Sequence, residues 1–442
     1  MRRILIFISI ISFSSCSSFL DVEPTRYVSS DKIFDSKENF YAALTGCYDA
    51  LQEEWYYGRT LVIIGDLASD VSYANGTKIE LKEIDDNAIL SDNIAINGLW
   101  GNIYEAVNRI NYLLWFIDDV PNLEEETKND YIGQLKFLRA LHYYNLVRLF
   151  GNVPLKLTPT INDNIENFKP RTSKDSVYEI IIEDLSFAKN HLTNTKPEFA
   201  SLTASKALLA SVYLTIGNFE LAYQMANEAL SENQYLEPVY ANIFSDVKIS
   251  NEILFYVPFS SEDKNRLAEY HYPRQLGGRH ENAPTQNFID QIEERDSRKS
   301  FVSTAFNGVY YCNKYSSLST GSDKVIILRT AELYFIRSEA LLNIDGFFAG
   351  NIVLNDINTI RQRARLNLVN VNSLEELFDL LYKEKMIEFA FEGKRWFDLI
   401  RTNQALDKVP TVTDSYQMLF PIPISEISAN PFITEADQNE GY

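Results

Sequence analysis

The sequence predicts a mainly α protein in which tetratricopeptide-like helix pairs form a scaffold that carries an irregular insertion of loops and short strands. Apolar residues recur three and four positions apart over long segments near both ends of the chain, which is typical of amphipathic helices. Residues 203–236 also have the small residues and the glycine of a tetratricopeptide helix pair. Between residues 237 and 325 the helical periodicity fades, and Gly, Pro, Asn and Ser accumulate.

The first part of the scaffold contains three strongly periodic segments. Residues 37–54, 98–118 and 129–149 each place apolar side chains on one stripe, with polar residues between them. Trp100 and Trp115 belong to the second segment and have apolar neighbours at helical spacing. We therefore expect both indoles to pack inside the scaffold.

The helix pair is predicted by its small residues. Ala210, Ala222 and Ala229 stand where two helices would cross closely, and Gly217 would turn the chain between them. A second, looser unit with the same plan of helix, glycine turn and helix covers residues 332–366. Such units stack, because none of them can bury its apolar face alone.

The beginning of the chain has the pattern of an export signal. Two arginines precede an apolar run of about ten residues, which is too short to span a bilayer as a helix. Ser14 and Ser15 then stand directly before Cys16, as in a bacterial lipoprotein signal. We predict that residues 1–15 are a lipoprotein signal peptide and that Cys16 receives the lipid anchor. The alternative is an ordinary signal peptide with an incidental cysteine.

These patterns divide the chain into four expected parts. A signal peptide covers residues 1–15, and an N-terminal helical scaffold covers residues 16–236. A variable insertion, the expected ligand-binding part, covers residues 237–325, and a C-terminal helical scaffold covers residues 326–442. Long loops that are held by a rigid frame are where binding surfaces tend to lie.

Composition and charge exclude several classes of function. The chain has 442 residues and a formal net charge of −20, from 41 Lys+Arg against 61 Asp+Glu. This charge opposes binding to nucleic acid, so we predict no nucleic-acid partner. Cys47 and Cys312 allow at most one disulfide, and Cys47 falls at helical spacing in an apolar stripe. The four histidines have no partner at a metal-ligand spacing. We predict neither a metal site nor a cofactor.

Four motifs give the chain a specific resemblance, which spans nearly all of it beyond the signal peptide. They are "LWGNIYEAVNRIN" at 99–111, "LKFLRALHYYNLVRLFGNVPL" at 135–155, "KEKMIEFAFEGKRWFDLIRT" at 383–402 and "LFPIPISEISANPFITEADQNEGY" at 419–442. In this order they resemble the SusD/RagB-like family of nutrient-binding outer-membrane lipoproteins. The resemblance implies a right-handed stack of tetratricopeptide-like helix pairs and a more variable half with the ligand site.

The same resemblance implies a function. Members of this family are not enzymes; they bind oligosaccharides, and in some cases peptides, at the cell surface. They cover a SusC-like TonB-dependent transporter, which takes the ligand across the outer membrane. The resemblance therefore implies a lipid-anchored, surface-exposed binding protein that delivers its ligand to such a transporter.

One charged segment suggests catalysis. Within three turns of one expected helix, over 383–402, lie the charged residues Glu388, Glu392, Lys394, Arg395 and Asp398. We interpret them as ion pairs that fix the end of a helix while Trp396 packs inward. A surface-anchored glycoside hydrolase or another polymer-degrading enzyme is the alternative, but a pair of carboxylates is weak evidence in a chain with 61 acidic residues.

A sugar site combines flat aromatic rings with side chains that can pair with hydroxyl groups. Two stretches have this mixture: the loop after the first helix, and the insertion. The insertion has no tryptophan, which weakens the case for a long neutral polysaccharide and leaves small glycans or peptides open. Ordinary packing is the alternative for any single tyrosine. The predicted ligand-binding residues are Trp55, Tyr57, Asp66, Tyr73, Asn75, Tyr270, Arg274, Arg279 and Tyr311.

Overall fold

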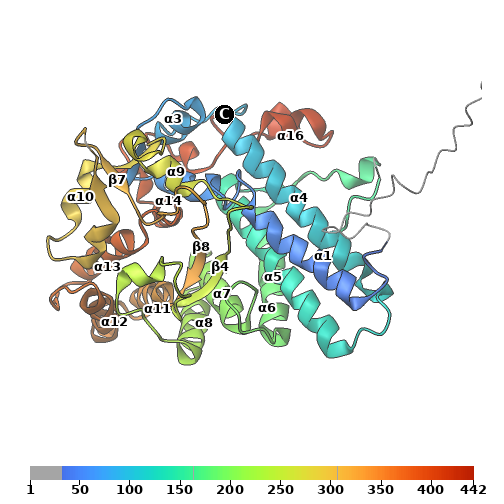
Figure 1. Cartoon of the computed structure of the whole chain (residues 1–442), viewed down its shortest axis with the longest axis horizontal. Coiled ribbons are helices and arrows are strands. Elements are labelled where there is room, and N and C mark those ends of the chain that lie inside the picture. The colour runs from blue at the N-terminus through green and yellow to red at the C-terminus, as the bar shows by residue number, and fades with distance from the viewer. Residues whose placement is uncertain (1–31, 163, 306) are drawn as a thin grey trace, which may run out of the picture.

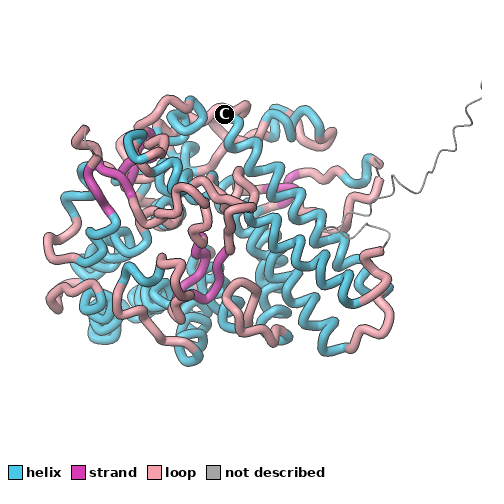
Figure 2. Tube along the Cα trace, in the orientation of Figure 1, coloured by secondary structure: helices cyan, strands magenta, loops and turns pink. Residues whose placement is uncertain are grey.

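The structure, a computed structural model, describes residues 32–162, 164–305 and 307–442. Its helices dominate, and strands are short (Figures 1 and 2), so the predicted mainly α fold class is confirmed. The predicted signal peptide and Cys16 lie outside the described residues. The α-helices are α1 Lys37–Asp49, α2 Thr60–Leu67, α3 Ile79–Asp85, α4 Ile94–Phe116, α5 Glu125–Phe150, α6 Lys174–His191, α7 Leu202–Thr215, α8 Phe219–Glu232, α9 Leu267–His271, α10 Gln286–Gln291, α11 Thr330–Asp345, α12 Gly350–Arg363, α13 Leu374–Phe389, α14 Arg395–Arg401, α15 Ala405–Lys408 and α16 Ile424–Ala429.

The strands form four separate antiparallel pairs. Strands β1 and β5 pair, as do β2 and β3, β4 and β8, and β6 and β7. Figure 2 shows them as short segments among the helices. Their bounds are β1 Ser72–Ala74, β2 Val153–Pro154, β3 Arg171–Thr172, β4 Ile253–Val257, β5 Asn282–Pro284, β6 Val302–Thr304, β7 Tyr310–Cys312 and β8 Val325–Arg329.

The long helices pack as a continuous row. Helix α5 packs on α4 and α6, α7 packs on α6 and α8, and α11 packs on α8 and α12 (Figure 1). Serine or asparagine caps begin many of these helices: Ser201, for example, accepts a hydrogen bond from the backbone N–H of Ala204. Gly217 has a φ of +75° between α7 and α8, which glycine adopts without strain. The predicted helix pair at 203–236 is confirmed.

Two local expectations are wrong. Trp115 is 58% exposed near the end of α4, whereas Trp100 is buried as expected. The expected single helix over 383–402 is broken between α13 and α14, where Phe391 and Gly393 have φ values of +66° and +70°. The break lets this loop pack closely on α2. The close contact requires a glycine at position 65, because a Cβ atom on Gly65 would lie 2.3 Å from the carbonyl oxygen of Gly393.

Buried ion pairs connect the region between α8 and β8 to the C-terminal helices. Arg329, which is fully buried, contacts Glu252 at 2.8 Å, Glu388 at 2.5 Å and Glu392 at 2.9 Å. Arg298 adds contacts from the chain before β6, including one of 3.3 Å to Glu388. Burial opposes ionisation of Glu388, but Arg363, Arg329 and Arg298 together hold the pKa of its carboxyl well below the usual range.

The interpretation of the charged segment is thus confirmed in substance. Glu388, Glu392 and Asp398 are held in ion pairs, and Trp396 is fully buried. The pairs join separate elements, however, and do not fix the end of one helix as expected. Cys47 and Cys312 are both buried free thiols, so they form no disulfide with each other.

Candidate functional site

The two predicted ligand-binding stretches meet in the structure through one pair of strands. Strand β1 follows α2, and β5 lies in the insertion more than 200 positions later; Tyr73 is opposite Ala283 in their register. The backbone N–H of Asn75 donates to the carbonyl oxygen of Glu281 at 3.0 Å, and the Asn75 side-chain amide donates to that of His280 at 3.1 Å. Sequence-distant parts of the chain therefore form one surface.

The β6–β7 hairpin borders this strand pair. The Nε2 atom of His280 lies 3.0 Å from the carbonyl oxygen of Tyr310. The ring of Tyr311 lies 5.2 Å from that of Tyr272 and 6.4 Å from the imidazole of His280. Figure 1 shows β7 near α9 at this side of the molecule. We use the term loop surface for the partly or fully exposed side chains gathered here: Tyr73, Asn75, Tyr272, Arg274, Arg279 and Tyr311.

Two tyrosines of the loop surface, Tyr73 and Tyr272, keep their hydroxyl protons at neutral pH. Burial, and then the neighbouring Tyr311, raise the pKa of Tyr272 to about 12. Burial, and then the carboxylate of Asp85, also raise the pKa of Tyr73. Each ring thus offers an apolar face together with a hydroxyl that can donate or accept a hydrogen bond.

The two arginines of the loop surface lie at its edge. Arg274 is exposed in a short turn, Arg274–Leu276. The side chain of Arg279 is 44% exposed and pairs with Glu269, which also pairs with Arg266 at 2.8 Å. Hydrogen bonds from Arg266, and then from Arg279, lower the pKa of the Glu269 carboxyl. This pairing orients Arg279 while leaving part of its guanidinium open to solvent.

Trp55, which is half-buried, and Tyr270, whose ring centre lies 5.8 Å from the guanidinium carbon of Arg279, are both held by Arg59. The guanidinium carbon of Arg59 lies 4.5 Å from the centre of the Trp55 ring and 4.7 Å from that of Tyr270. Arg59 also donates to the Tyr270 hydroxyl at 2.7 Å, and Tyr270 is only 1% exposed. The indole of Trp55 covers Gly98, where a Cβ atom would fall 2.5 Å from the ring. This layered contact fixes the loop after α1 to α9 and α4.

Asp66 is also inside the protein. It is fully buried, and its carboxylate accepts hydrogen bonds from the backbone N–H groups of Phe391 at 3.2 Å and Gly393 at 3.3 Å. Burial raises the pKa of this carboxyl to about 8, although the two N–H groups act in the opposite direction. Asp66 therefore holds the loop between α13 and α14 and presents no surface to a ligand.

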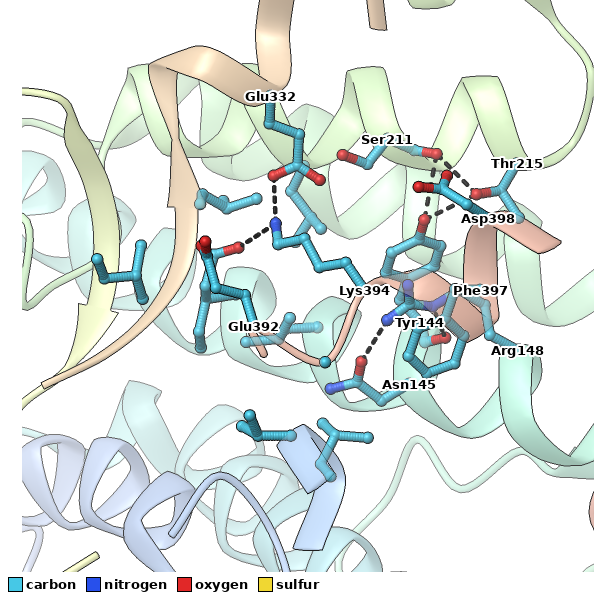
Figure 3. A pocket seen from close by; sticks show the side chains of 18 of the residues that line it. Tyr144, Asn145, Arg148, Ser211, Thr215, Glu332, Glu392, Lys394, Phe397 and Asp398 are labelled. Atoms are coloured by element: carbon cyan, nitrogen blue, oxygen red, sulfur yellow. Dashed lines mark hydrogen bonds and ion pairs between the residues drawn. The ribbon is translucent and has the colours of Figure 1, made fainter. Parts of the chain in front are cut away.

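Tyr57 faces a different space from the loop surface. It lines a cavity of about 90 Å³ between α2, α5, α7, β8 and the start of α14 (Figure 3). Arg148, which the sequence analysis missed, lies in this cavity with its guanidinium carbon 3.9 Å from the ring centre of Tyr144 and 3.8 Å from that of Phe397. In the sequence, the signal for this contact is the i,i+4 spacing of Tyr144 and Arg148 within the motif at 135–155.

Comparison with known proteins agrees with the fold. A sequence profile described as "Starch-binding associating with outer membrane" matches residues 18–214, and one described as "SusD family" matches residues 290–411. The chain belongs to the SusD/RagB-like family. The two matches flank β5, the strand that places Asn282 beside β1, and neither of them covers residues 215–289.

Individual relatives of this SusD/RagB-like chain match it over different lengths. A SusD-like protein of Formosa agariphila is 27% identical over 511 residues, which is 100% of this chain and 99% of that protein. The starch-binding protein SusD of Bacteroides thetaiotaomicron is 35% identical, but only over 128 residues, or 26% of this chain and 21% of that protein.

Solved structures share the fold of this family member. A SusD superfamily protein from Bacteroides vulgatus superposes with a TM-score of 0.84 at 22% identity, and the match covers 92% of this chain and 100% of that one. A laminarin-binding SusD-like protein superposes with a TM-score of 0.82, also at 22% identity, over the same fractions. At this level of identity the likeness concerns the fold alone.

The described ranges contain neither a metal-binding cluster nor a membrane-spanning helix. No group of three or more His, Cys, Asp or Glu side chains in residues 32–162, 164–305 and 307–442 is arranged to hold a metal ion. In the same ranges, no helix has the length and apolar character needed to cross a membrane.

Proposed function

We propose that this chain is a cell-surface binding protein that captures oligosaccharides and delivers them to a SusC-like TonB-dependent outer-membrane transporter. The observation that carries the proposal is the β1–β5 pairing, which brings Tyr73 and Asn75 onto one surface with Tyr272 and Tyr311. Partly exposed tyrosine rings beside an amide and two arginines suit the apolar faces and hydroxyl groups of a sugar.

The named relatives support the ligand class. One is a starch-binding protein and another binds laminarin, and both ligands are glycans. Peptides are the second ligand class that we propose, because Asn75 and the arginines could also pair with a peptide backbone. In this proposal, residues 237–325 supply most of the binding surface, and residues 16–236 and 326–442 supply the scaffold.

The proposed location rests on the sequence and the family. The pattern around Cys16 predicts a lipid anchor, and one matching profile describes association with the outer membrane. An anchored protein at the outer surface would hold its ligand close to a transporter in the same membrane. Replacing Cys16 with Ala should release the protein from the membrane fraction, and a variant that still incorporates labelled fatty acid would contradict the anchor.

Binding without turnover is part of the proposal. The carboxylates that suggested catalysis, Glu388, Glu392 and Asp398, are committed to buried ion pairs. Most sites that hydrolyse glycosides use two carboxyl groups facing the substrate. Beside the loop surface, Glu269 is committed to Arg266 and Arg279, and Asp85 accepts a hydrogen bond from the backbone N–H of Ala74. No observation favours the hydrolase alternative.

The test is calorimetric titration of the whole protein with a panel of purified oligosaccharides and peptides. We expect one class of oligosaccharide to bind and to be recovered unchanged, as judged by mass spectrometry. Binding of peptides alone would show that the ligand class is peptides and not oligosaccharides. Steady release of shortened products would overturn the proposal of a binding protein.

A further inference from the structure

The cavity in Figure 3 is separate from the loop surface and has an unusual distribution of charge. It adjoins a second hollow of about 340 Å³, since Leu214, Thr215 and Arg401 line both spaces. The combined space falls within the range of about 300–1,000 Å³ that is typical of small-molecule sites. It lies among the scaffold helices α5, α7, α11, α13 and α14.

The acidic side chains in the cavity wall are already paired. Glu332 pairs with Lys394, and Asp398 contacts Lys385 at 2.6 Å and Arg401 at 2.8 Å. The remaining carboxylate, Glu392, is paired with the buried Arg329 and Lys314. These ion pairs leave no carboxylate in the wall free for a further cation.

Arg148 is the exception among the cations in the wall. Its Nε–H donates to the backbone oxygen of Tyr144 at 3.2 Å, and Nη2 donates to the Asn145 side-chain oxygen at 2.6 Å. A guanidinium has five N–H donors, so three are left over, and Arg148 forms no ion pair with any residue in the described ranges. The rings of Tyr144 and Phe397 hold it in place from both sides (Figure 3).

Tyr57 supplies a second spare donor in the same wall. Its oxygen accepts a hydrogen bond from the Asn145 amide at 3.0 Å, but its own proton has no acceptor among the described residues. Tyr57 is 7% exposed, and burial raises its pKa to about 12, so the proton stays in place. Buried donors normally have a partner, and here a ligand would provide it.

We propose that this cavity binds the carboxylate of a small acidic sugar through Arg148 and Tyr57, with the sugar ring in the adjoining hollow. Guanidinium groups pair with carboxylates through two parallel hydrogen bonds, and the position of Arg148 between two rings holds its plane ready for such a pair. The hollow offers the rings of Phe378 and Tyr382, stacked at 5.9 Å, as an apolar surface for the sugar.

The test compares three probes on the whole protein: glucuronate, glucose and acetate, each titrated by ligand-observed NMR. We expect glucuronate to bind at least tenfold more tightly than glucose, because only glucuronate has the carboxylate, and more tightly than acetate, because acetate has no ring. Equal binding of glucuronate and glucose would overturn the role of Arg148, and equal binding of glucuronate and acetate would overturn the role of the hollow.

Variants locate the binding. Arg148→Gln should abolish the preference for glucuronate, and Tyr57→Phe, which removes one oxygen, should weaken glucuronate binding about tenfold in a folded protein. Arg109→Gln is the matched control, because Arg109 is an exposed arginine paired with Glu105 on α4, outside the cavity.

An unchanged preference for glucuronate in folded Arg148→Gln, or in Tyr57→Phe if Arg148→Gln does not fold, would refute the site. Substitutions at Tyr73 and Tyr311 should leave glucuronate binding unaltered, which separates this inference from the proposed function.

Discussion

The helix row and the insertion are stabilised in different ways. Between α5, α6, α7 and α8 the contacts are made by fully buried apolar side chains, such as Leu138 and Ile181, together with the ion pair of Arg139 and Asp184 at 2.8 Å. The insertion is attached to the C-terminal helices through an apolar cluster that includes Phe288 and Ile387, and also through a network of buried charges, with Arg329 and Arg298 between several glutamates. Apolar contact is spread over many residues, whereas each buried ion pair depends on its partner. The comparison teaches that the insertion depends on a network of buried charges in addition to its apolar contacts.

The largest expected effect comes from the buried charges. Arg329→Ala would leave Glu252, Glu388 and Glu392 without their shared partner, and we expect a loss of about 3–5 kcal/mol in the free energy of unfolding. Urea denaturation measures it. Arg109→Ala, which removes an exposed ion pair, should change stability by less than about 1 kcal/mol. If Arg329→Ala lost no more unfolding free energy than the control Arg109→Ala, the comparison would be contradicted.

A single change in the helix row should cost somewhat less. Leu138 is fully buried in α5, so Leu138→Ala removes apolar contact and leaves a cavity, at a cost of about 3 kcal/mol. The same urea experiment applies, and both arms of the comparison then share one scale. If Leu138→Ala lowered the free energy of unfolding more than Arg329→Ala did, the apolar packing of the helix row would be more sensitive to a single change than the buried charges are.

Asp66 should make stability depend on pH. Its pKa is raised from 3.8 to about 8, so the folded protein prefers the protonated carboxyl. The cost in folding free energy of ionising the buried carboxyl is absent below pH 3.8 and grows as the pH rises from 3.8 to about 8. Relative to the native protein, Asp66→Asn should therefore gain stability between these two pH values. Urea titrations across the window test this, and a difference that does not change with pH would refute the assignment.

Local features of the fold could be predicted from the sequence. The α7–α8 pair is encoded by neighbouring residues, including Gly217, so its helices and turn were predicted correctly. The break between α13 and α14 was not, because it depends on Asp66 and Gly65 of α2, which hold the loop from a distant part of the chain. Trp115 was misplaced because helical spacing does not show where a neighbouring helix ends.

The candidate site could be predicted as regions and not as individual residues. Aromatic and polar composition indicated both stretches, but the pairing of β1 with β5 depends on the tertiary fold. For the same reason the sequence did not separate the partly exposed Tyr73 and Tyr311 from Tyr270, which Arg59 covers, or from Tyr57, which lines another cavity. Burial of a tyrosine depends on which helix lies opposite it, and its own sequence neighbours do not reveal that.

The central claim is that one ligand contacts both stretches on the loop surface. The most direct measurement is the calorimetric affinity of the best-binding oligosaccharide for Tyr73→Ala, Tyr311→Ala and the control Tyr235→Ala, an exposed tyrosine outside the loop surface. A stacked ring contributes about 1 kcal/mol beyond its buried area, and burial of its surface adds about 1.5–3 kcal/mol. We predict a loss of tenfold or more for each of the first two variants, none for the control, and little change in melting temperature. Undiminished affinity in folded Tyr73→Ala and Tyr311→Ala would contradict the account.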